Sequence, residues 1–375
     1  MSTRSHVTLF LCGDVMTGRG IDQVLHHSCD PRLHERFVTS ALDYVALAER
    51  TSGPMPRGVD DAYVWGEALD VLASRRPDAR IVNLETSITT SDDADPKGIN
   101  YRMHPENVGV LTAAAIDCCV LANNHVIDWG RAGLDDTLDT LCRAGVRVAG
   151  AGRDLCEARS PAVLDVRDAE GDVATRVLVY AFGATDSGIP TRWAAGAERS
   201  GVHLLRDYSD ASVEEIASVV HATKQSGDMA IASIHWGGNW GYHVPHAHRR
   251  FAHALIDRAG IDVVHGHSSH HSKAIEVYRG HVILYGCGDF LTDYEGIPGH
   301  DEFRDDLTLA YFPVIDIRSG QLVRLEMVPL QIRSFSLRRA PALDRAWSRD
   351  TLDRQCRRFG ARVTPVDDAL VFEAL

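Results

Sequence analysis

Short apolar runs rich in β-forming residues recur along this 375-residue chain and constrain its fold more than any other feature. They occupy residues 7–12, 80–84, 116–122, 176–182, 229–234, 261–264 and 281–284. Continuous runs of this length are typical of strands that are covered on both faces. Segments with helical spacing of apolar residues lie between them, at 134–144, 210–223 and 246–259. This alternation of strands and helices predicts a layered α/β fold.

Six of the predicted strands end in side chains that bind metals or transfer protons. These side chains are Asp14, Asn83 with Glu85, Asn124 with His125, His235, His265 with His267, and Asp289. A single histidine after a strand is usually an ordinary core or surface residue. However, ligands of open α/β sheets bind in the crevice at the carboxyl ends of the strands. We therefore expect the six strand ends to meet at one site.

The expected ligands are carboxylate and amide oxygens and imidazole nitrogens, with no thiolate among them. This donor set suits Ca²⁺, Mn²⁺, Mg²⁺ or Fe²⁺ better than a structural Zn²⁺. We expect one divalent ion, Ca²⁺ or Mn²⁺ in the first place, with Mg²⁺ as the alternative. The eight cysteines are scattered and form no Cys-x-x-Cys pair, so we expect reduced thiols with a structural role.

The formal net charge of −13 disfavours a general nucleic-acid binder, because phosphate affinity comes from Lys and Arg, and it does not favour docking on anionic lipid. The apolar run near the N-terminus has only about six residues, too few for a signal-peptide core or a membrane span. We therefore expect a cytoplasmic protein without nucleic-acid or membrane partners. The sequence does not indicate its oligomeric state.

The chain is predicted to form a single domain over residues 1–375. Residues 30–61 contain a helical stretch and a Gly/Pro patch, which indicate an insertion that forms a lid or a substrate wall. Residues 168–175 are predicted to form a polar hairpin turn. From residue 310 the pattern changes to β runs followed by an Arg-rich helical tail. We interpret residues 310–375 as a β-rich and helical C-terminal extension.

Several motifs follow one another along the chain in a specific order. They are Cys12-Gly13-Asp14-Val15-Met16, Asn83-Leu84-Glu85, Leu121-Ala122-Asn123-Asn124-His125, Asp128-Trp129-Gly130, His235-Trp236-Gly237, Asp262-Val263-Val264-His265-Gly266-His267 and Tyr285-Gly286-Cys287-Gly288-Asp289-Phe290. Together they resemble the CapA family, which is associated with capsule and poly-γ-glutamate synthesis, over residues 7–295. The resemblance implies a calcineurin-like metallophosphoesterase fold, a four-layer α/β sandwich with two central β-sheets flanked by helices.

The same resemblance implies roles for individual residues. The positions that hold metal in the wider fold are occupied here by Asp14, Glu85, Asn124, His235 and His267. His125 matches the acid/base histidine of the fold.

The chain also departs from these patterns. Calcineurin-like phosphatases carry a His where Met16 stands, and Asn83-Leu84-Glu85 replaces their Gly-Asp-x-x-Asp motif. These losses disfavour a dinuclear phosphatase, because a two-metal hydrolase must hold both ions close together. Relative to the capsule-synthesis pattern, the chain has gained His265 and Asp289 near the expected site. Members of that family usually carry an N-terminal membrane anchor, and we expect none here.

A cation surrounded by His and Asp suits proton transfer at a carbon next to a carbonyl. A soluble relative of the family acts in this way, as the metal-dependent peptide epimerase of lasso-peptide biosynthesis, which inverts a C-terminal residue. We therefore predict an epimerase that inverts the Cα of a residue in a ribosomal peptide by two-base His/Asp chemistry. The catalytic candidates are His125, His265, Asp14 and Asp289, and the candidates for binding the peptide are Arg102, Trp236 and Trp240.

Other functions remain open at this point. The first is a CapA-type hydrolase or ligase of poly-γ-glutamate or capsule synthesis that acts on amide bonds. A metallophosphoesterase and a non-catalytic binding protein stabilised by a metal are the others.

Overall fold

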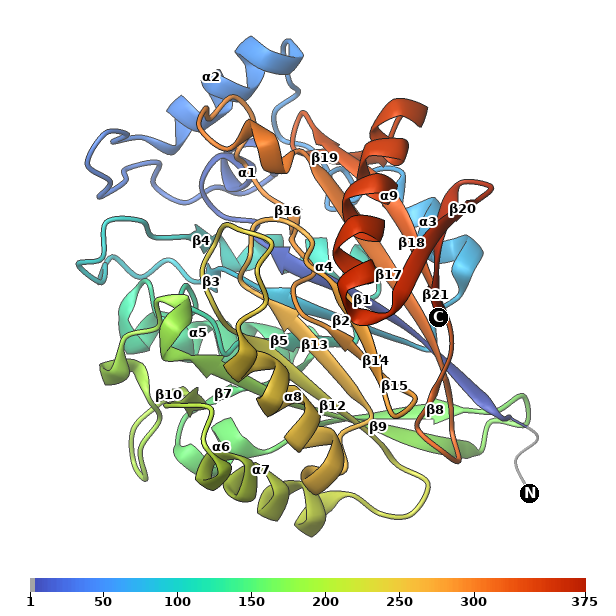
Figure 1. Ribbon diagram of the computed structural model, residues 1–375. Helices are drawn as coiled ribbons and strands as arrows, with labels where there is room; N and C mark the ends of the chain where they lie inside the picture. Colours follow the sequence, from blue (N-terminus) through green and yellow to red (C-terminus); the bar gives the residue numbers. More distant parts are fainter. Residues whose placement is uncertain (1–3) are drawn as a thin grey trace.

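Two β-sheets stacked face to face form the centre of the molecule, and helices cover their outer faces (Figure 1). The computed structural model describes residues 4–375. The layer between the sheets is apolar and contains Leu9 and Ile81 from the larger sheet with Ile231 and Val263 from the second. This arrangement confirms the expected α/β sandwich with two central sheets.

The larger sheet has ten strands. Eight of them follow the order β20 (Ala361–Val366), β21 (Ala369–Ala374), β18 (Leu322–Arg333), β17 (Leu307–Asp316), β1 (His6–Val15), β2 (Ala79–Leu84), β5 (Cys118–Val120) and β6 (Arg147–Ala149). The other two are β16 (Asp289–Leu291) beside β1 and β19 (Ser336–Arg339) beside β18.

The second sheet has seven strands. Six follow the order β11 (Leu204–Leu205), β9 (Val173–Ala184), β12 (Met229–His235), β13 (Val263–His267), β15 (His281–Leu284) and β14 (Ile275–Tyr278), and β8 (Ala162–Arg167) lies beside β9. Two short pairs complete the strands, β3 (Ser87–Ile88) with β4 (Arg102–Met103) and β7 (Ala151–Gly152) with β10 (Gly201–Val202).

Helices cover both outer faces. The larger sheet shares a hydrophobic cluster with α1 (Arg19–Val24), α2 (Ala41–Ser52), α3 (Ala68–Arg75), α4 (Gly109–Ala113) and α5 (Gly130–Arg143). The second sheet shares another cluster with α7 (Asp210–Thr223) and α8 (His246–Ala259), and α6 (Leu155–Arg159) lies beside β7. The last helix, α9 (Ala342–Cys356), inserts Leu352 and Cys356 into the layer between the sheets.

Parallel pairing gathers the strand ends that the sequence singles out. The strands β1, β2, β5 and β6 run parallel to one another in the larger sheet, as do β9, β12, β13 and β15 in the second. Because parallel strands end at the same edge of a sheet, the residues that follow them are brought close together.

The predicted helices at 210–223 and 246–259 match α7 and α8 residue for residue. The third predicted helix, at 134–144, is longer in the structure, because α5 already begins at Gly130. The strand predicted at 7–12 also continues to Val15, because Asp14 pairs with Asp289 of β16. Residues 168–172 form the turn of the β8–β9 hairpin, in which the Asp168 amide donates to the Asp172 carbonyl.

The insertion and the C-terminal extension are both joined to the core. In residues 30–61, α2 packs Val45 and Ala48 into the cluster under the larger sheet, and the role of this segment as a lid stays a prediction. In residues 310–375, the β strands complete the larger sheet, where β17 pairs antiparallel with β1.

All eight cysteines carry free thiols and six of them are buried, in keeping with a structural role. None of the helices in residues 4–375 has the length and apolar character required to cross a membrane.

Gly13 permits the close approach that sets Asp14 opposite Asp289. A Cβ at this position would lie 1.6 Å from the Gly288 carbonyl oxygen, which is backbone and cannot move aside. We expect Gly13→Ala to lower the free energy of unfolding by about 3 kcal/mol, as overpacking does. Gly238→Ala is the control, because its Cβ would meet nothing within 4 Å. Urea denaturation of both variants checks this, and equal midpoints would contradict it.

Candidate metal centre

The strand ends meet at a cavity of about 410 Å³. Its lining includes Glu85, Asn124, His125, His235 and His270. Asp14, His267 and Asp289 are buried beside these residues. The structure thus brings together all five predicted metal ligands and two of the other predicted acid/base residues, His125 and Asp289.

One group of ligand atoms comes from Asp14, His235 and His267, all within 4.8 Å of one another. The two histidines are cross-strand partners on β12 and β13, and their Nδ1 atoms lie 2.8 Å apart. Burial lowers the pKa of both imidazoles well below its ordinary value, so both rings are neutral. A neutral imidazole offers a lone pair, which is the form that binds a metal.

A second group comes from Asp14, Glu85 and Asp289, again within 4.8 Å of one another. Burial, together with the neighbouring Asp289 carboxylate, raises the pKa of Asp14 to about 7. Burial and the charge of Asp14 also raise the pKa of Glu85 well above its ordinary value. Carboxylates that repel one another out of water are stabilised by a bound cation, so both groups fit a divalent ion. The prediction of a single ion stays a prediction.

Asn83, which the sequence places beside these ligands, orients Asp14. Its Nδ2 donates to Asp14 Oδ1 over 2.7 Å, and the Asn123 side chain donates in turn to Asn83 Oδ1 over 3.0 Å. The Ser268 amide donates to the other oxygen of Asp14 over 3.3 Å. These bonds hold the carboxylate that both ligand groups share.

Two His–Asp pairs line the same cavity. In the first, His125 Nδ1 lies 2.6 Å from Asp128 Oδ2, and the Tyr101 ring stacks on the imidazole at 3.9 Å. Lys97 Nζ donates to Asp128 Oδ1 over 2.7 Å. In the second, His270 Nδ1 lies 2.9 and 3.0 Å from the two oxygens of Asp289.

The two pairs differ in their affinity for a proton. Burial lowers the pKa of His125 to about 4, so this ring is a neutral base at pH 7. Burial also acts to lower the pKa of His270, but the Asp289 carboxylate outweighs it and raises that pKa above its ordinary value. Neighbouring groups whose pKa values are pushed apart are suited to act as base and acid in one reaction.

His265, a predicted base, does not line the cavity. It is fully buried, with Nε2 2.8 Å from the Cys12 carbonyl and Nδ1 3.0 Å from Ser233 Oγ. Asp289, which the sequence analysis names together with His265 as a residue gained near the site, pairs with His270. His270 was not among the predicted site residues, because it follows the last residue of β13 by three positions and lies outside the motif that ends at His267.

The predicted substrate residues are placed differently from one another. Trp240 lines the cavity and stacks on His300 at 3.8 Å. The Arg102 guanidinium is turned away from the cavity, because it donates to the Ser91 carbonyl and Asp92 and lies 3.9 Å from the Trp129 ring centre. The buried Trp236 ring stacks on His248 at 4.6 Å and donates to the Tyr285 carbonyl, outside the cavity lining.

Arg19 forms part of the cavity wall and was also missed by the sequence analysis. Its guanidinium donates to Asp293 over 2.5 and 3.2 Å and to Glu35 over 3.0 Å. It lies 3.8 Å from the centre of the Tyr44 ring and 4.7 Å from that of Tyr101. Glu35 and Tyr44 belong to residues 30–61, so this segment supplies one wall of the site.

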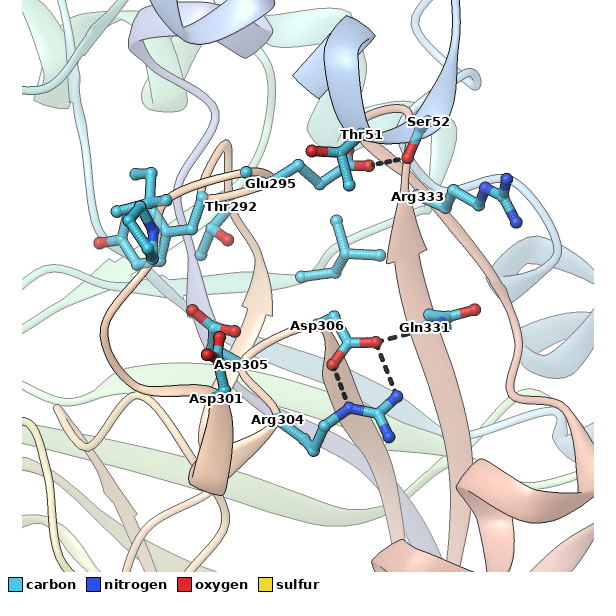
Figure 2. A pocket seen from close by; sticks show the side chains of 15 residues that line it. Thr51, Ser52, Thr292, Glu295, Asp301, Arg304, Asp305, Asp306, Gln331 and Arg333 are labelled. Carbon is cyan, nitrogen blue, oxygen red and sulfur yellow. Dashed lines mark hydrogen bonds and ion pairs between the residues drawn. The ribbon is translucent and has the colours of Figure 1, made fainter. Parts of the chain in front are cut away.

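A second cavity of about 610 Å³, drawn in Figure 2, shares part of its lining with the first. The two share Tyr294, Ile297, Pro298 and Asp305 as lining residues. In the second cavity Asp306 is held by Arg304 and Gln331, and Glu295 accepts a hydrogen bond from Ser52, as Figure 2 shows.

The fold and the candidate metal site define a protein of the calcineurin-like metallophosphoesterase class. Residues 8–294 match the family described as bacterial capsule synthesis protein PGA_cap, and the chain belongs to this family. The predicted CapA assignment is thereby confirmed.

Three relatives illustrate the range of similarity. A probable polyglutamine synthesis accessory protein of Mycobacterium tuberculosis (strain H37Rv) is 49% identical over 367 residues, which cover 97% of this chain and 95% of the relative. The PGA biosynthesis protein CapA of Bacillus subtilis (strain 168) is 28% identical, covering 74% of this chain and 66% of the relative. The capsule biosynthesis protein CapA of Bacillus anthracis is 25% identical, covering 88% and 68%. The predicted epimerase activity stays a hypothesis.

Asp14 belongs to both ligand groups, so its charge is the one that metal binding depends on most. We expect Asp14→Asn to weaken Mn²⁺ binding at least tenfold and to remove the rise in melting temperature that bound metal produces. Calorimetric titration and thermal melts with and without EDTA measure both effects. Asp350→Asn, an exposed site, is the control. Undiminished Mn²⁺ binding by Asp14→Asn would contradict the assignment.

The buried pair of Arg19 and Asp293 is expected to stabilise the wall of the site. Asp293→Ala leaves a buried guanidinium with Glu35 as its remaining carboxylate partner and should cost about 3–5 kcal/mol. Asp92→Ala breaks a comparable pair with Arg102, but Asp92 is 70% exposed, so less than about 1 kcal/mol is expected. Urea denaturation of the two variants measures both losses in the free energy of unfolding. Equal losses would contradict the expectation that the buried pair contributes more to stability than the exposed one.

Proposed function

We propose that this protein is a metal-dependent enzyme that acts on amide bonds of a glutamate-containing polymer during its synthesis. The observation that carries the proposal is the presence of two His–Asp pairs, His125 with Asp128 and His270 with Asp289, whose histidines line one cavity beside the candidate metal ligands. The substrate class is supported by the names of the relatives, which describe polyglutamine, PGA and capsule synthesis. A divalent ion at this site would supply Lewis acidity toward a substrate carbonyl.

The residues of the chain account for the proton transfers. His125 is held by Asp128 through Nδ1, so its Nε2 is directed at the site, 3.8 Å from Glu85 Oε1, and can accept a proton from an attacking water. Lys97 and the stacked Tyr101 ring fix the orientation of this pair. His270 is paired with Asp289 through Nδ1, and its Nε2 lies 2.9 Å from the Asn239 side-chain amide, which donates to it as placed. A protonated His270 requires this amide to turn its oxygen toward Nε2–H, and the same proton can then pass to the departing amine nitrogen.

The adjoining cavity supports a polymeric substrate. Because Tyr294, Ile297, Pro298 and Asp305 line both cavities, a linear chain bound at the metal ligands could continue into the second space. A small phosphate ester would need the first cavity alone. Met16, at the position of a phosphatase His, points its sulfur to the Gly18 amide at 3.2 Å, which also disfavours that chemistry.

The epimerase hypothesis is the second candidate, and one observation favours it. The same two His–Asp pairs could remove a proton from a Cα and return it from another direction, with no bond in the chain broken. Hydrolysis and epimerisation therefore require the same groups and differ in their products.

Incubation with Mn²⁺ and γ-glutamyl oligomers in D₂O separates the candidates. Cleavage with new amine ends supports the amide-bond enzyme, whereas deuterium at Cα in an intact chain supports the epimerase. Rapid turnover of an aryl phosphate without either change would refute both.

The same assay tests the two histidines. We expect His125→Ala and His270→Ala each to lower kcat about 100-fold or more, the usual contribution of a general acid or base. His221→Ala, at an exposed position of α7, is the control. Full activity in either cavity variant would exclude that histidine from the reaction.

A further inference from the structure

His265 is fully buried and lies outside the cavity lining, yet both of its ring nitrogens have partners. Nε2 lies 2.8 Å from the Cys12 carbonyl oxygen, and Nδ1 lies 3.0 Å from Ser233 Oγ. The same Ser233 oxygen lies 3.0 Å from Nε2 of His267. A chain of hydrogen bonds therefore runs from the backbone of β1 to one of the candidate metal ligands.

The position of Cys12 fixes the start of this chain. The pairing of β1 with β2 shifts register between Leu11 and Asp14, and Cys12 lies in this irregular stretch. Its carbonyl is buried and accepts a hydrogen bond from the opposite sheet. Because a carbonyl oxygen can only accept, the proton of His265 must be on Nε2.

The remaining directions follow from counting protons. The partners of the buried His265 ring are a carbonyl and a hydroxyl, and no carboxylate among the described residues pairs with it to balance a charge. With its one proton on Nε2, the ring has a lone pair on Nδ1 that accepts the hydroxyl proton of Ser233. A serine has only one hydroxyl proton, so Ser233 Oγ must accept from Nε2–H of His267. A neutral His267 with its proton on Nε2 has a free lone pair on Nδ1.

We propose that Ser233 and His265 are positioning residues that hold His267 in the tautomer whose Nδ1 can bind a cation. His235 is held in the same tautomer, because its Nε2 donates to Asn124 Oδ1 over 2.9 Å and its Nδ1 therefore carries a lone pair. Two lone pairs then face each other across 2.8 Å, an arrangement that a cation stabilises.

The alternative tautomer of His267 shows what the hydrogen bonds of Ser233 and His265 prevent. If His267 carried its proton on Nδ1, it could donate directly to His235 Nδ1 and close the site with an internal hydrogen bond. A cation would then have to displace this proton before binding. The hydrogen bonds through Ser233 and His265 keep the proton off Nδ1 of His267, so no proton competes with the cation there. This holds for either proposed reaction.

The tautomer can be measured on the unsubstituted protein, with one variant used only to assign the signal. In metal-free protein with ¹⁵N-labelled histidine, two-bond ¹H–¹⁵N correlation distinguishes the protonated from the free ring nitrogen, and His267→Gln assigns the signal by its loss. We expect a protonated Nε2 and a free Nδ1 on His267. A proton on Nδ1 would overturn the proposal.

Metal affinity gives the second measurement. Ser233→Ala should weaken Mn²⁺ binding about 10- to 100-fold in a titration of the metal alone, as loss of a partner behind a metal ligand does. Ser187→Ala is the matched control, because Ser187 is also buried but its hydroxyl donates to the Ala184 carbonyl. Ser233→Cys keeps the side-chain size if the Ala variant fails to fold, and should show a loss of binding in the same direction. Unchanged affinity at position 233, or an equal loss in Ser187→Ala, would overturn the proposal.

Discussion

The carboxylates of Asp14, Glu85 and Asp289 are buried side by side, and the rest of the site is arranged around the cost of placing them there. Burial of an unpaired carboxylate costs several kcal/mol. The cationic side chains that line the cavity meet this cost only in part, because Lys97 is bound to Asp128 and Arg19 to Asp293 and Glu35, and His270 pairs with Asp289 alone. A divalent cation bound here would balance the charge of these carboxylates. The neutral imidazoles of His235 and His267 would serve as further ligands without adding charge.

The scaffold holds these groups through backbone geometry. Gly13 lets β1 approach residue 288, which places Asp14 in register with Asp289, and the change of register near Cys12 leaves a carbonyl for His265. Both features belong to β1, which is a strand of the larger sheet and also contacts β13 of the second sheet. Small changes in this strand should therefore affect stability and metal binding together.

The sequence was sufficient to predict the sandwich and the meeting of Asp14, Glu85, Asn124, His235 and His267, because parallel strands end at a common edge. The sequence could not show where each side chain along a strand lies relative to the site. His265 and His267 are two residues apart on β13 and so share a face, and both are buried, but only His267 has a ring nitrogen close to Asp14 and His235. The role of His270 was equally hidden, because its orientation depends on Asp289 from a distant strand. The sequence did not show that Arg102 packs against Trp129 and Trp236 against His248, because nothing local indicates these contacts. Substrate binding by the two residues stays a prediction.

The arrangement of the two cavities bears on the size of the substrate. A peptide bound with its C-terminal residue at the reacting centre still extends in the N-terminal direction, so it could lie across the shared wall of Tyr294, Ile297 and Pro298 just as a longer polymer could. The larger space therefore fits an extended chain of either kind. In the amide-bond reaction that we propose, a bond within that chain lies at His125 and His270. The same two histidines would then act successively on the attacking water and on the departing nitrogen.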